Sequence, residues 1–427
     1  MYNEKEIPIY DFVCVISETL DLVVPALSGH HKKVAIIACR IAQSMNIPDE
    51  EIQYIILASM LHDVGAFSAA ERLKIQQYNS FEEGLDEHAI RGSRLLKGFA
   101  PFSKVAKIIQ YHHANYDPLK RSIPLGSYIV HLADRISVLP DERLEILGQV
   151  PEILENIRLK KHQFHPDILA AFINLSKLEC FWIEAFLPSA NTSVLKKALF
   201  SKKIIGVDIL KSFAKVLSQL IDFRTGFTAT HSSGVAAVAR DLAAISGFSE
   251  RECKLMEIAG LLHDIGKLAV PNEILEKNGK LNKEEFNVIK KHTFYTHSIL
   301  SKITGLEEVA IWASYHHERL DGNGYPFHVK GEDFSKLARI MAVADTFTAL
   351  TEDRPYRLGM NKEQSMEVLF NMAKYGGIDK NLIGLANNNF FRINEIRVKA
   401  QKEERKDYNN FQKTVGKLFD ADEMQSA

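Results

Sequence analysis

The chain has 427 residues, with 53 basic and 54 acidic side chains and a formal net charge of −1 at pH 7. This balance gives no bulk attraction to nucleic acid or to an anionic membrane, so we expect no DNA or RNA partner. The uninterrupted apolar runs fall short of the roughly 20 residues that a membrane-spanning helix needs, so we expect no membrane insertion.

The cysteines and the N-terminal residues indicate a cytoplasmic protein. Cys14, Cys39, Cys180 and Cys253 lie far apart and form no CxxC pair, which is typical of reduced thiols rather than of a disulfide framework. The first residues carry no basic segment, and acidic side chains interrupt the apolar run that follows. A signal peptide is therefore not indicated.

Apolar residues recur at spacings of three and four along most of the chain, which indicates helices. The clearest examples are EEIQYIILASMLHD at 50–63 and RECKLMEIAGLLHD at 251–264, which are typical of buried helices that end in a turn. Between them, PSANTS from Pro188 to Ser193 combines proline with small polar residues and marks a break. We therefore predict an all-α protein of two tandem domains, residues 1–190 and 191–427.

The chain ends in a charged segment from about Arg397, in which Phe411, Val415, Leu418 and Phe419 could form an apolar stripe on one last helix. We assign this C-terminal helical tail to the second domain. It docks on its own domain or contacts a partner, which leaves a homodimer open.

The two halves repeat one pattern of histidines and aspartates. MLHDVGAF and YHHANYD in the first half correspond to LLHDIGKL and YHHERLDG in the second. Two intervals are identical in both halves. They are 32 positions for His30 to His62 and for His231 to His263, and 24 positions for His88 to His112 and for His292 to His316. The pattern predicts a duplicated helical domain.

The second half gathers five histidines and two aspartates: His231, His263, Asp264, His292, His316, His317 and Asp345. Nitrogen and oxygen donors without a thiolate suit iron, manganese, cobalt, nickel or zinc, and argue against a structural zinc site. Consecutive residues on a helix point about 100° apart, so His263 and Asp264 can serve two metals if the carboxylate bridges them. Two metals about 3.5–4 Å apart can activate a water for phosphoryl displacement.

Three blocks of the second half, in order, resemble the HD-GYP subgroup of the HD phosphohydrolases. They are HDIGK at His263 to Lys267, HHERLDGNGYP at His316 to Pro326, and ADTFTALTEDRPYR at Ala344 to Arg357. The resemblance covers roughly residues 207–389. It implies an all-helical, metal-dependent domain that hydrolyses cyclic di-GMP or a related 3′,5′-linked cyclic dinucleotide.

The resemblance also implies the metal content. Some members carry a glutamate four residues before the first histidine ligand, which helps to hold a third metal, and Phe227 stands at that position here. We therefore expect two divalent metal ions, with iron or manganese ahead of nickel, cobalt or zinc. One metal would have the ligands His231, His263, Asp264 and Asp345, and the other Asp264, His292, His316 and His317.

Catalytic and substrate-binding roles follow from the same resemblance. Asp264 would bridge the metals, and Lys267 would stabilise charge on a phosphate oxygen, unless it is a solvated lysine at a helix end. Arg354 and Arg357 would clamp phosphate, with surface ion pairing as the alternative. Gly324 lets the loop approach a ligand closely.

Tyr325 offers a ring and a hydroxyl near the metals. It would contact the substrate or only pack the loop.

The first half keeps the whole ligand pattern, at His30, His62, Asp63, His88, His112, His113 and Asp134. Ala66 replaces the lysine, Ile146 replaces the second arginine, and the glycine-rich loop is missing. This half therefore resembles a general HD domain. We expect a second metal centre, in a phosphohydrolase or nucleotidase domain acting on a linear dinucleotide or a mononucleotide, or in a copy kept for packing or regulation.

The leading hypothesis is a metal-dependent phosphodiesterase that opens cyclic di-GMP or cyclic GMP-AMP to a linear dinucleotide, with mononucleotides as the further product. Nothing in the sequence specifies the base edges. One alternative is a nucleotide phosphohydrolase of another specificity. The glycine-rich segment that ends in Gly324, Tyr325 and Pro326, the GYP loop, argues against this alternative in the second half only. The other is a non-catalytic cyclic dinucleotide sensor, against which the complete ligand set and Lys267 argue.

Overall fold

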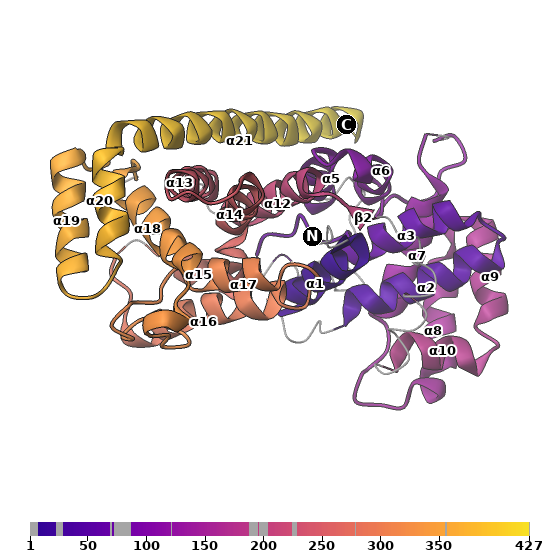
Figure 1. Ribbon diagram of the computed structural model, residues 1–427. Helices are drawn as coiled ribbons and strands as arrows, with labels where there is room; N and C mark the ends of the chain where they lie inside the picture. Colours follow the sequence, from indigo (N-terminus) through magenta and orange to yellow (C-terminus); the bar gives the residue numbers. More distant parts are fainter. Residues whose placement is uncertain are drawn as a thin grey trace. The chain divides into compact units, whose positions relative to one another are not determined.

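The computed structural model describes residues 7–22, 29–68, 71, 87–120, 122–187, 195, 204–223, 229–277, 279–354 and 357–426. Helices make up both halves of the chain (Figure 1), which confirms the predicted all-α class. The strands β1 (Ile7–Pro8) and β2 (Ile204–Ile205) form one short antiparallel pair. None of the described helices combines the length and the apolar composition that crossing a bilayer requires.

The chain divides into two compact units. The first unit contains Phe12–Lys203 and the residues from Phe411, and the second contains Ile204–Asn410 and the described residues up to Asp11. The break predicted at residue 190 lies outside the described residues, so the division into 1–190 and 191–427 stays a prediction.

The described part of the first unit is built of helices. They are α1 (Ile9–Leu22), α2 (His30–Ser44), α3 (Asp49–Leu61), α5 (Glu87–Lys97), η2 (Ala100–Phe102), α6 (Ser103–Gln110), α7 (Leu125–Ser137), α8 (Ile146–Leu159), η3 (Lys161–Gln163), α9 (Pro166–Leu175) and α10 (Glu179–Phe186). Helix α1 begins among the residues grouped with the second unit.

The second unit repeats this plan and extends it. Its helices are α12 (Val207–Asp222), α13 (His231–Ile245), α14 (Glu250–Leu262), η4 (Ile265–Ala269), α15 (Asn272–Leu275), α16 (Lys283–Leu300), α17 (Glu307–Ser314), η5 (Gly331–Asp333), α18 (Lys336–Thr351), α19 (Lys362–Lys374), α20 (Lys380–Asn388) and α21 (Phe390–Ser426). Helix α21 continues into the residues grouped with the first unit. Phe411 and Val415 of the predicted stripe are buried, and the side chains beyond Val415 lie outside the description.

Five helices of the first unit recur in the same order in the second. Helices α2, α3, α5, α6 and α7 correspond to α13, α14, α16, α17 and α18. Helix α2 packs on α3 and α7, and α13 packs on α14 and α18 in the same way. The duplication predicted from histidine spacing is thus also a duplication of helix packing.

Local signals fix where the helices around the histidines begin. Ser249 and Glu252 form a capping box at the start of α14, and Asn282 and Glu285 form one at the start of α16. Each box satisfies backbone N–H groups that a helix start leaves unpaired. The buried face of α14 then holds the helix so that its C-terminal end presents His263.

Gly65 and Gly266 stand at the same place in the two units, two residues after the aspartate of the HD pair. A Cβ atom on Gly266 would lie 1.9 Å from the carbonyl oxygen of His292, and one on Gly65 would lie 2.1 Å from that of His88. Only glycine allows this approach of the two backbones. The approach brings the histidine on α5 or α16 up to the HD pair.

We expect Gly266→Ala to destabilise the protein by about 2–3 kcal/mol, because the added methyl group must displace α16. Thermal unfolding followed by circular dichroism would measure the loss. Gly384→Ala is the matched control, since a Cβ there meets no atom within 4 Å and alanine is favoured over glycine inside a helix. Equal melting temperatures for Gly266→Ala and the wild type would contradict the close approach.

Candidate metal centres

The seven residues predicted as ligands in the second unit converge. They are His231 at the start of α13, His263 and Asp264 at the end of α14, His292 on α16, His316 and His317 after α17, and Asp345 on α18. Two groups have ligand atoms that all lie within 4.8 Å of one another: His231, His263 and Asp264, and His292, His316 and His317.

The carboxylate of Asp264 lies between these two groups. Its Oδ2 is 3.2 Å from Nε2 of His263, and its Oδ1 is 3.4 Å from Nε2 of His292 and 3.9 Å from Nε2 of His316. Asp345 completes the first group, with its Oδ1 3.3 Å from Nε2 of His231. The two Asp264 oxygens thus face different histidines, which is the geometry that a bridging carboxylate needs.

Backbone carbonyls fix the orientation of three imidazoles. The Nδ1 atoms of His263, His292 and His316 lie 2.7, 2.6 and 2.7 Å from the carbonyl oxygens three residues earlier. A carbonyl can only accept, so each Nδ1 carries the proton and each Nε2 presents a lone pair. This is the tautomer that a metal ligand requires.

Burial and neighbouring charges set the protonation of the site. Burial lowers the pKa of His292 to about 3 and that of His317 to about 4, so both are neutral imidazoles at pH 7. Burial alone would raise the pKa of Asp264, but the charges of His263 and Lys267 outweigh it and hold that pKa well below its ordinary value. His292, His317 and Asp264 are therefore in the states that bind cations. Burial lowers the pKa of His263, but the charge of Asp264 outweighs it and raises that pKa, so His263 must release a proton when a metal binds.

One oxygen of the central aspartate lacks a hydrogen-bond partner in each unit. Oδ1 of Asp264 and Oδ1 of Asp63 are both buried and accept no hydrogen bond from the described residues. A buried carboxylate oxygen in this state is costly unless a cation compensates it. Together with the neutral imidazoles, these atoms fit divalent metal ions.

Lys267 lies at the edge of the centre. Its Nζ is 2.6 Å from Oδ2 of Asp264, and its side chain is 24% exposed. Burial lowers the pKa of Lys267, but Asp264 more than compensates and raises it above the ordinary value. The ammonium group is therefore charged and close enough to reach a ligand at the centre.

The two predicted phosphate clamps bind protein atoms here. Arg354 donates to Oε1 of Glu352 from Nε at 3.2 Å and from a terminal nitrogen at 3.0 Å. Arg357 donates to the carbonyl oxygen of Ala349 at 2.7 Å. Because Glu352 also contacts His231, Arg354 is linked to the centre through that carboxylate.

The GYP loop is held by a residue that the sequence analysis did not identify. Glu318 is buried and accepts hydrogen bonds from the backbone N–H groups of Phe327, His328 and Val329 at 2.7–3.2 Å. Gly324 lies against the same segment, and a Cβ there would come within 2.4 Å of the Glu318 backbone. Packing of the loop thus explains why a glycine stands at position 324. Glu318 could have been identified from the sequence, because it is an acidic residue directly after the two histidines predicted as ligands.

Tyr325 lies in an aromatic and cationic group beside the centre. Its ring centroid is 5.0 Å from that of His317 and 6.3 Å from that of Phe286. Nζ of Lys290 lies 5.4 Å from the Tyr325 ring and 5.0 Å from the Phe286 ring. Phe286 is 43% exposed. We call Phe286, Lys290 and Tyr325 the aromatic shelf. Sequence analysis identified only Tyr325 of the three, since Phe286 and Lys290 lie on α16, outside the recognised blocks.

Two carboxylates that the sequence analysis missed lie at the start of α13, the helix that begins with His231. Glu352 is buried and lies 3.1 Å from Nδ1 of His231. Asp222 is also buried and accepts from the backbone N–H and the hydroxyl of Ser232. Burial raises the pKa of Asp222 to about 7. The internal repeat could have revealed it, because Asp21 stands 201 positions earlier and contacts His31 at 2.6 Å.

The first unit reproduces the geometry of the second. Oδ2 of Asp63 is 3.5 Å from Nε2 of His62, and its Oδ1 is 3.4 Å from Nε2 of His88. Two groups again have ligand atoms within 4.8 Å: His30, His62 and Asp134, and Asp63, His88, His112 and His113. All seven predicted residues of this centre are buried.

The charged neighbour differs between the two centres. Ala66 replaces Lys267, and a buried arginine, Arg135, donates to Oδ2 of Asp134. The second unit has Thr346 at the position of Arg135. The first centre therefore keeps one nearby cation but places it beside the other aspartate.

Comparisons with known proteins agree with this duplicated site. Residues 27–139 and residues 215–382 each match a family described as HD domain. The chain is 32% identical over 383 residues to 3′3′-cGAMP-specific phosphodiesterase 1 of Vibrio cholerae serotype O1, covering 86% of this chain and 88% of that protein. It is 38% identical over 156 residues to the cyclic di-GMP phosphodiesterase response regulator RpfG of Xanthomonas campestris pv. campestris, covering 36% of this chain and 41% of that one.

A solved structure shares the fold along most of the chain. It is a cyclic GMP-AMP specific phosphodiesterase of V. cholerae, V-cGAP3, with a TM-score of 0.61 and 21% sequence identity, covering 90% of this chain and 98% of that one. Since the sequence alignment with phosphodiesterase 1 extends over nearly all of that relative, the chain belongs to the HD-GYP family of cyclic dinucleotide phosphodiesterases, with an HD domain in each half.

Proposed function

We propose that the second unit hydrolyses a 3′,5′-linked cyclic dinucleotide, cyclic GMP-AMP or cyclic di-GMP, to a linear dinucleotide and then to mononucleotides. The observation that carries this proposal is the buried Asp264 carboxylate, which directs one oxygen toward each histidine group. The names of the relatives support the substrate class. Coverage of most of phosphodiesterase 1 favours cyclic GMP-AMP as the first substrate to test.

We further propose that this unit holds two divalent metal ions, iron or manganese. One would have the ligands His231, His263, Asp264 and Asp345, and the other Asp264, His292, His316 and His317. Metals of this class supply an activated water and bind the oxygens of the transferred phosphoryl group. The protein would supply imidazoles whose Nδ1 atoms are held by backbone carbonyls, which leaves each Nε2 for the metal, and one carboxylate shared between the two sites.

Lys267 would assist by binding a phosphate oxygen. Its charged Nζ, 2.6 Å from Asp264, needs only a rotation of its side chain to turn from the carboxylate to a phosphate. A positioned cation stabilises the negative charge that develops in the transition state. Arg354 and Arg357 remain candidates for phosphate binding, and Arg354 would have to release Glu352 to do so.

The aromatic shelf gives a place for a nucleobase. Phe286 presents an exposed ring, and Tyr325 joins it to His317 of the centre. Purines stack on aromatic rings whatever their edge groups, which suits a site for both guanine and adenine. We propose that one base stacks on Phe286 and that Lys290, between the two rings, contacts the adjoining phosphate.

For the first unit, we propose a metal centre with its own role. The retained geometry around Asp63 supports metal binding. Burial of all seven residues favours a small substrate, such as the terminal phosphate of a linear product, or a regulatory role. Loss of one step of the reaction in a variant of this centre would distinguish these two roles.

The first prediction for this site concerns Glu352. We expect Glu352→Ala to weaken metal binding about 10- to 100-fold, because the carboxylate orients His231 and supports its basicity. Calorimetric titration with Mn²⁺, in a His62→Ala/Asp63→Ala background that removes the first centre, would measure the affinity. Glu363→Ala, which removes an exposed acid on α19, is the control. Unchanged affinity in the Glu352 variant would contradict the role.

The second prediction separates the two centres. We expect His263→Ala/Asp264→Ala to reduce ring opening by a factor on the order of 10³ or more, because ligands and bridge are lost together. His62→Ala/Asp63→Ala should leave ring opening intact. Chromatography of products from manganese-loaded protein with cyclic GMP-AMP, cyclic di-GMP and the linear dinucleotide would measure each step. Binding of these nucleotides without cleavage by the wild type would instead support a sensor.

The third prediction concerns the aromatic shelf. Removing a base-stacking ring costs about 1–3 kcal/mol, so Phe286→Ala should raise KM about tenfold and change kcat little. Phe286→Tyr keeps a ring and should retain the wild-type KM. Steady-state kinetics with cyclic GMP-AMP would provide both constants. A fall in kcat at constant KM would contradict stacking of the substrate.

A further inference from the structure

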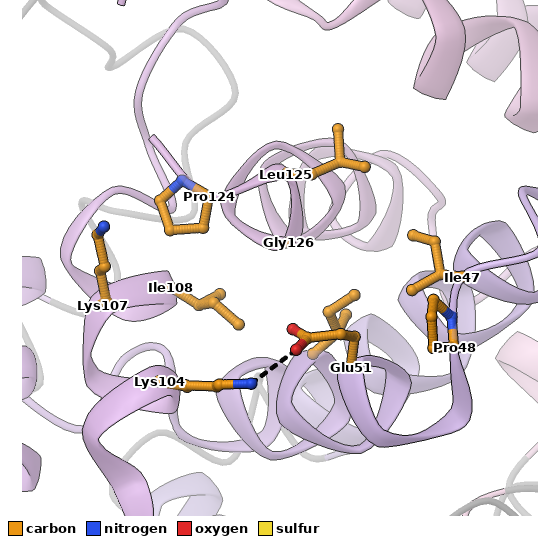
Figure 2. Close-up of a pocket in the computed structure, with 10 residues that line it drawn as sticks. Ile47, Pro48, Glu51, Lys104, Lys107, Ile108, Pro124, Leu125 and Gly126 are labelled. Carbon is orange, nitrogen blue, oxygen red and sulfur yellow. Dashed lines mark hydrogen bonds and ion pairs between the residues drawn. The ribbon is translucent and has the colours of Figure 1, made fainter. Parts of the chain in front are cut away.

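The first unit contains an apolar cavity of about 470 Å³ between the turn that precedes α3, helix α6 and the start of α7 (Figure 2). Its apolar lining is formed by Ile47, Pro48, Ile55, Ile108, Pro124 and Leu125. The volume is typical of small-molecule sites. We propose that this cavity is a regulatory site for an amphipathic monoanion, a ligand with an apolar body and one acidic group, and that it is coupled to the metal centre of the same unit.

The internal repeat has different side chains at two positions that line this cavity. Trp312 stands at the position of Ile108, four residues before the paired histidines, and Leu337 stands at that of Gly126, eight residues before the last aspartate. Both larger side chains are buried in the second unit. At the first position the first unit has the smaller Ile108, whereas the space beside Gly126 is occupied by Ile55 and Ile108. Pro48 and Leu125 on the lining are exposed. Apolar surface exposed to water costs free energy, so a ligand that covers them would be stabilised.

The polar groups around the cavity fix the charge of the ligand. Lys104 and Lys107 lie on one side, opposite Ile47 and Pro48 (Figure 2). Nζ of Lys104 is 2.7 Å from Oε1 of Glu51, so this pair is neutral as a whole. Among the described residues, no acidic group pairs with Lys107. The cavity therefore has one uncompensated positive charge at one end and an apolar surface at the other.

The three helices around the cavity also lead to the metal centre. Helix α3 leads from Ile55 to His62, α7 leads from Gly126 to Asp134, and α6 ends just before the paired histidines. At 1.5 Å per residue, the separations along α3 and α7 are about 10 and 12 Å. Gly126 is tightly packed, since a Cβ there would lie 3.0 Å from Ile55 and 3.1 Å from Ile108. A small molecule that binds between these helices and shifts them would therefore also shift the side chains proposed to hold the metal.

A fluorescent probe of the required chemistry tests the site. We expect 1-anilinonaphthalene-8-sulfonate to bind the full-length protein saturably, with one high-affinity site per chain. Ile108→Trp, which introduces the side chain of the second unit, should weaken binding at least tenfold. Leu125→Trp narrows the entrance at a residue that is 40% exposed, and it serves if Ile108→Trp does not fold by circular dichroism. Unchanged probe affinity in a folded variant would overturn the site.

Charge reversal tests the acidic group of the ligand. Lys107→Glu should weaken binding of the anionic probe about tenfold and leave binding of uncharged N-phenyl-1-naphthylamine unchanged. Lys97→Glu, an exposed position on α5, is the charge-matched control. Equal losses for both probes, or for both variants, would overturn the assignment of Lys107.

Coupling is tested by reciprocity, because metal and probe must change each other's affinity by the same factor. We expect the probe affinity to differ at least threefold between metal-free protein and protein saturated with Mn²⁺. This difference should disappear in His62→Ala/Asp63→Ala and persist in His263→Ala/Asp264→Ala. If Ile108→Trp or Leu125→Trp abolishes probe binding but Mn²⁺ does not change the probe affinity, the cavity remains a binding site and its coupling to the metal centre is overturned. None of these measurements requires catalytic activity.

Discussion

The structure depends on burying one aspartate between two groups of histidines. Asp264 and Asp63 each direct their two oxygens to different imidazoles. In both residues Oδ1 accepts no hydrogen bond from the described residues. Such a carboxylate is costly in an apolar interior, and without a metal its charge is balanced by protons, since the pKa of His263 and that of His62 are both raised by the aspartate that follows each. Gly65 and Gly266 let two backbones approach each other, and backbone carbonyls fix the orientation of the imidazoles. Both features hold the donor atoms where they could bind cations.

The two centres share their geometry but differ in the position of their positive charge. In the second unit, Lys267 lies beside the bridging Asp264 and remains partly exposed. In the first, Arg135 is buried beside Asp134. A cation at the edge of a site can transfer its hydrogen bonds to a substrate, whereas a buried arginine that holds a carboxylate mainly fixes that carboxylate. The same ligand set can therefore support ring opening in one unit and a different reaction, or regulation, in the other.

Sequence periodicity and histidine spacing predicted the helical class, the duplication and the residues that converge, because ligands on helices keep fixed positions relative to their own turns. The family was predicted from three short blocks and is confirmed. Glu318 and Glu352 could not be predicted in the same way, since their partners come from a loop and from a distant helix end. Phe227, at the position associated with a third metal, lies outside the described residues.

The internal repeat also allows each residue of one unit to be compared with its counterpart in the other unit. Where both units agree, as at Gly65 and Gly266, the shared fold explains the residue. Where they differ under the same packing, the shared fold does not by itself explain the residue. The second unit has the larger, buried Trp312 where the first has Ile108, which lies on the lining of the cavity. This difference lies on the helix that ends just before the paired histidines of each centre, which is where the proposed ligand of the first unit would act.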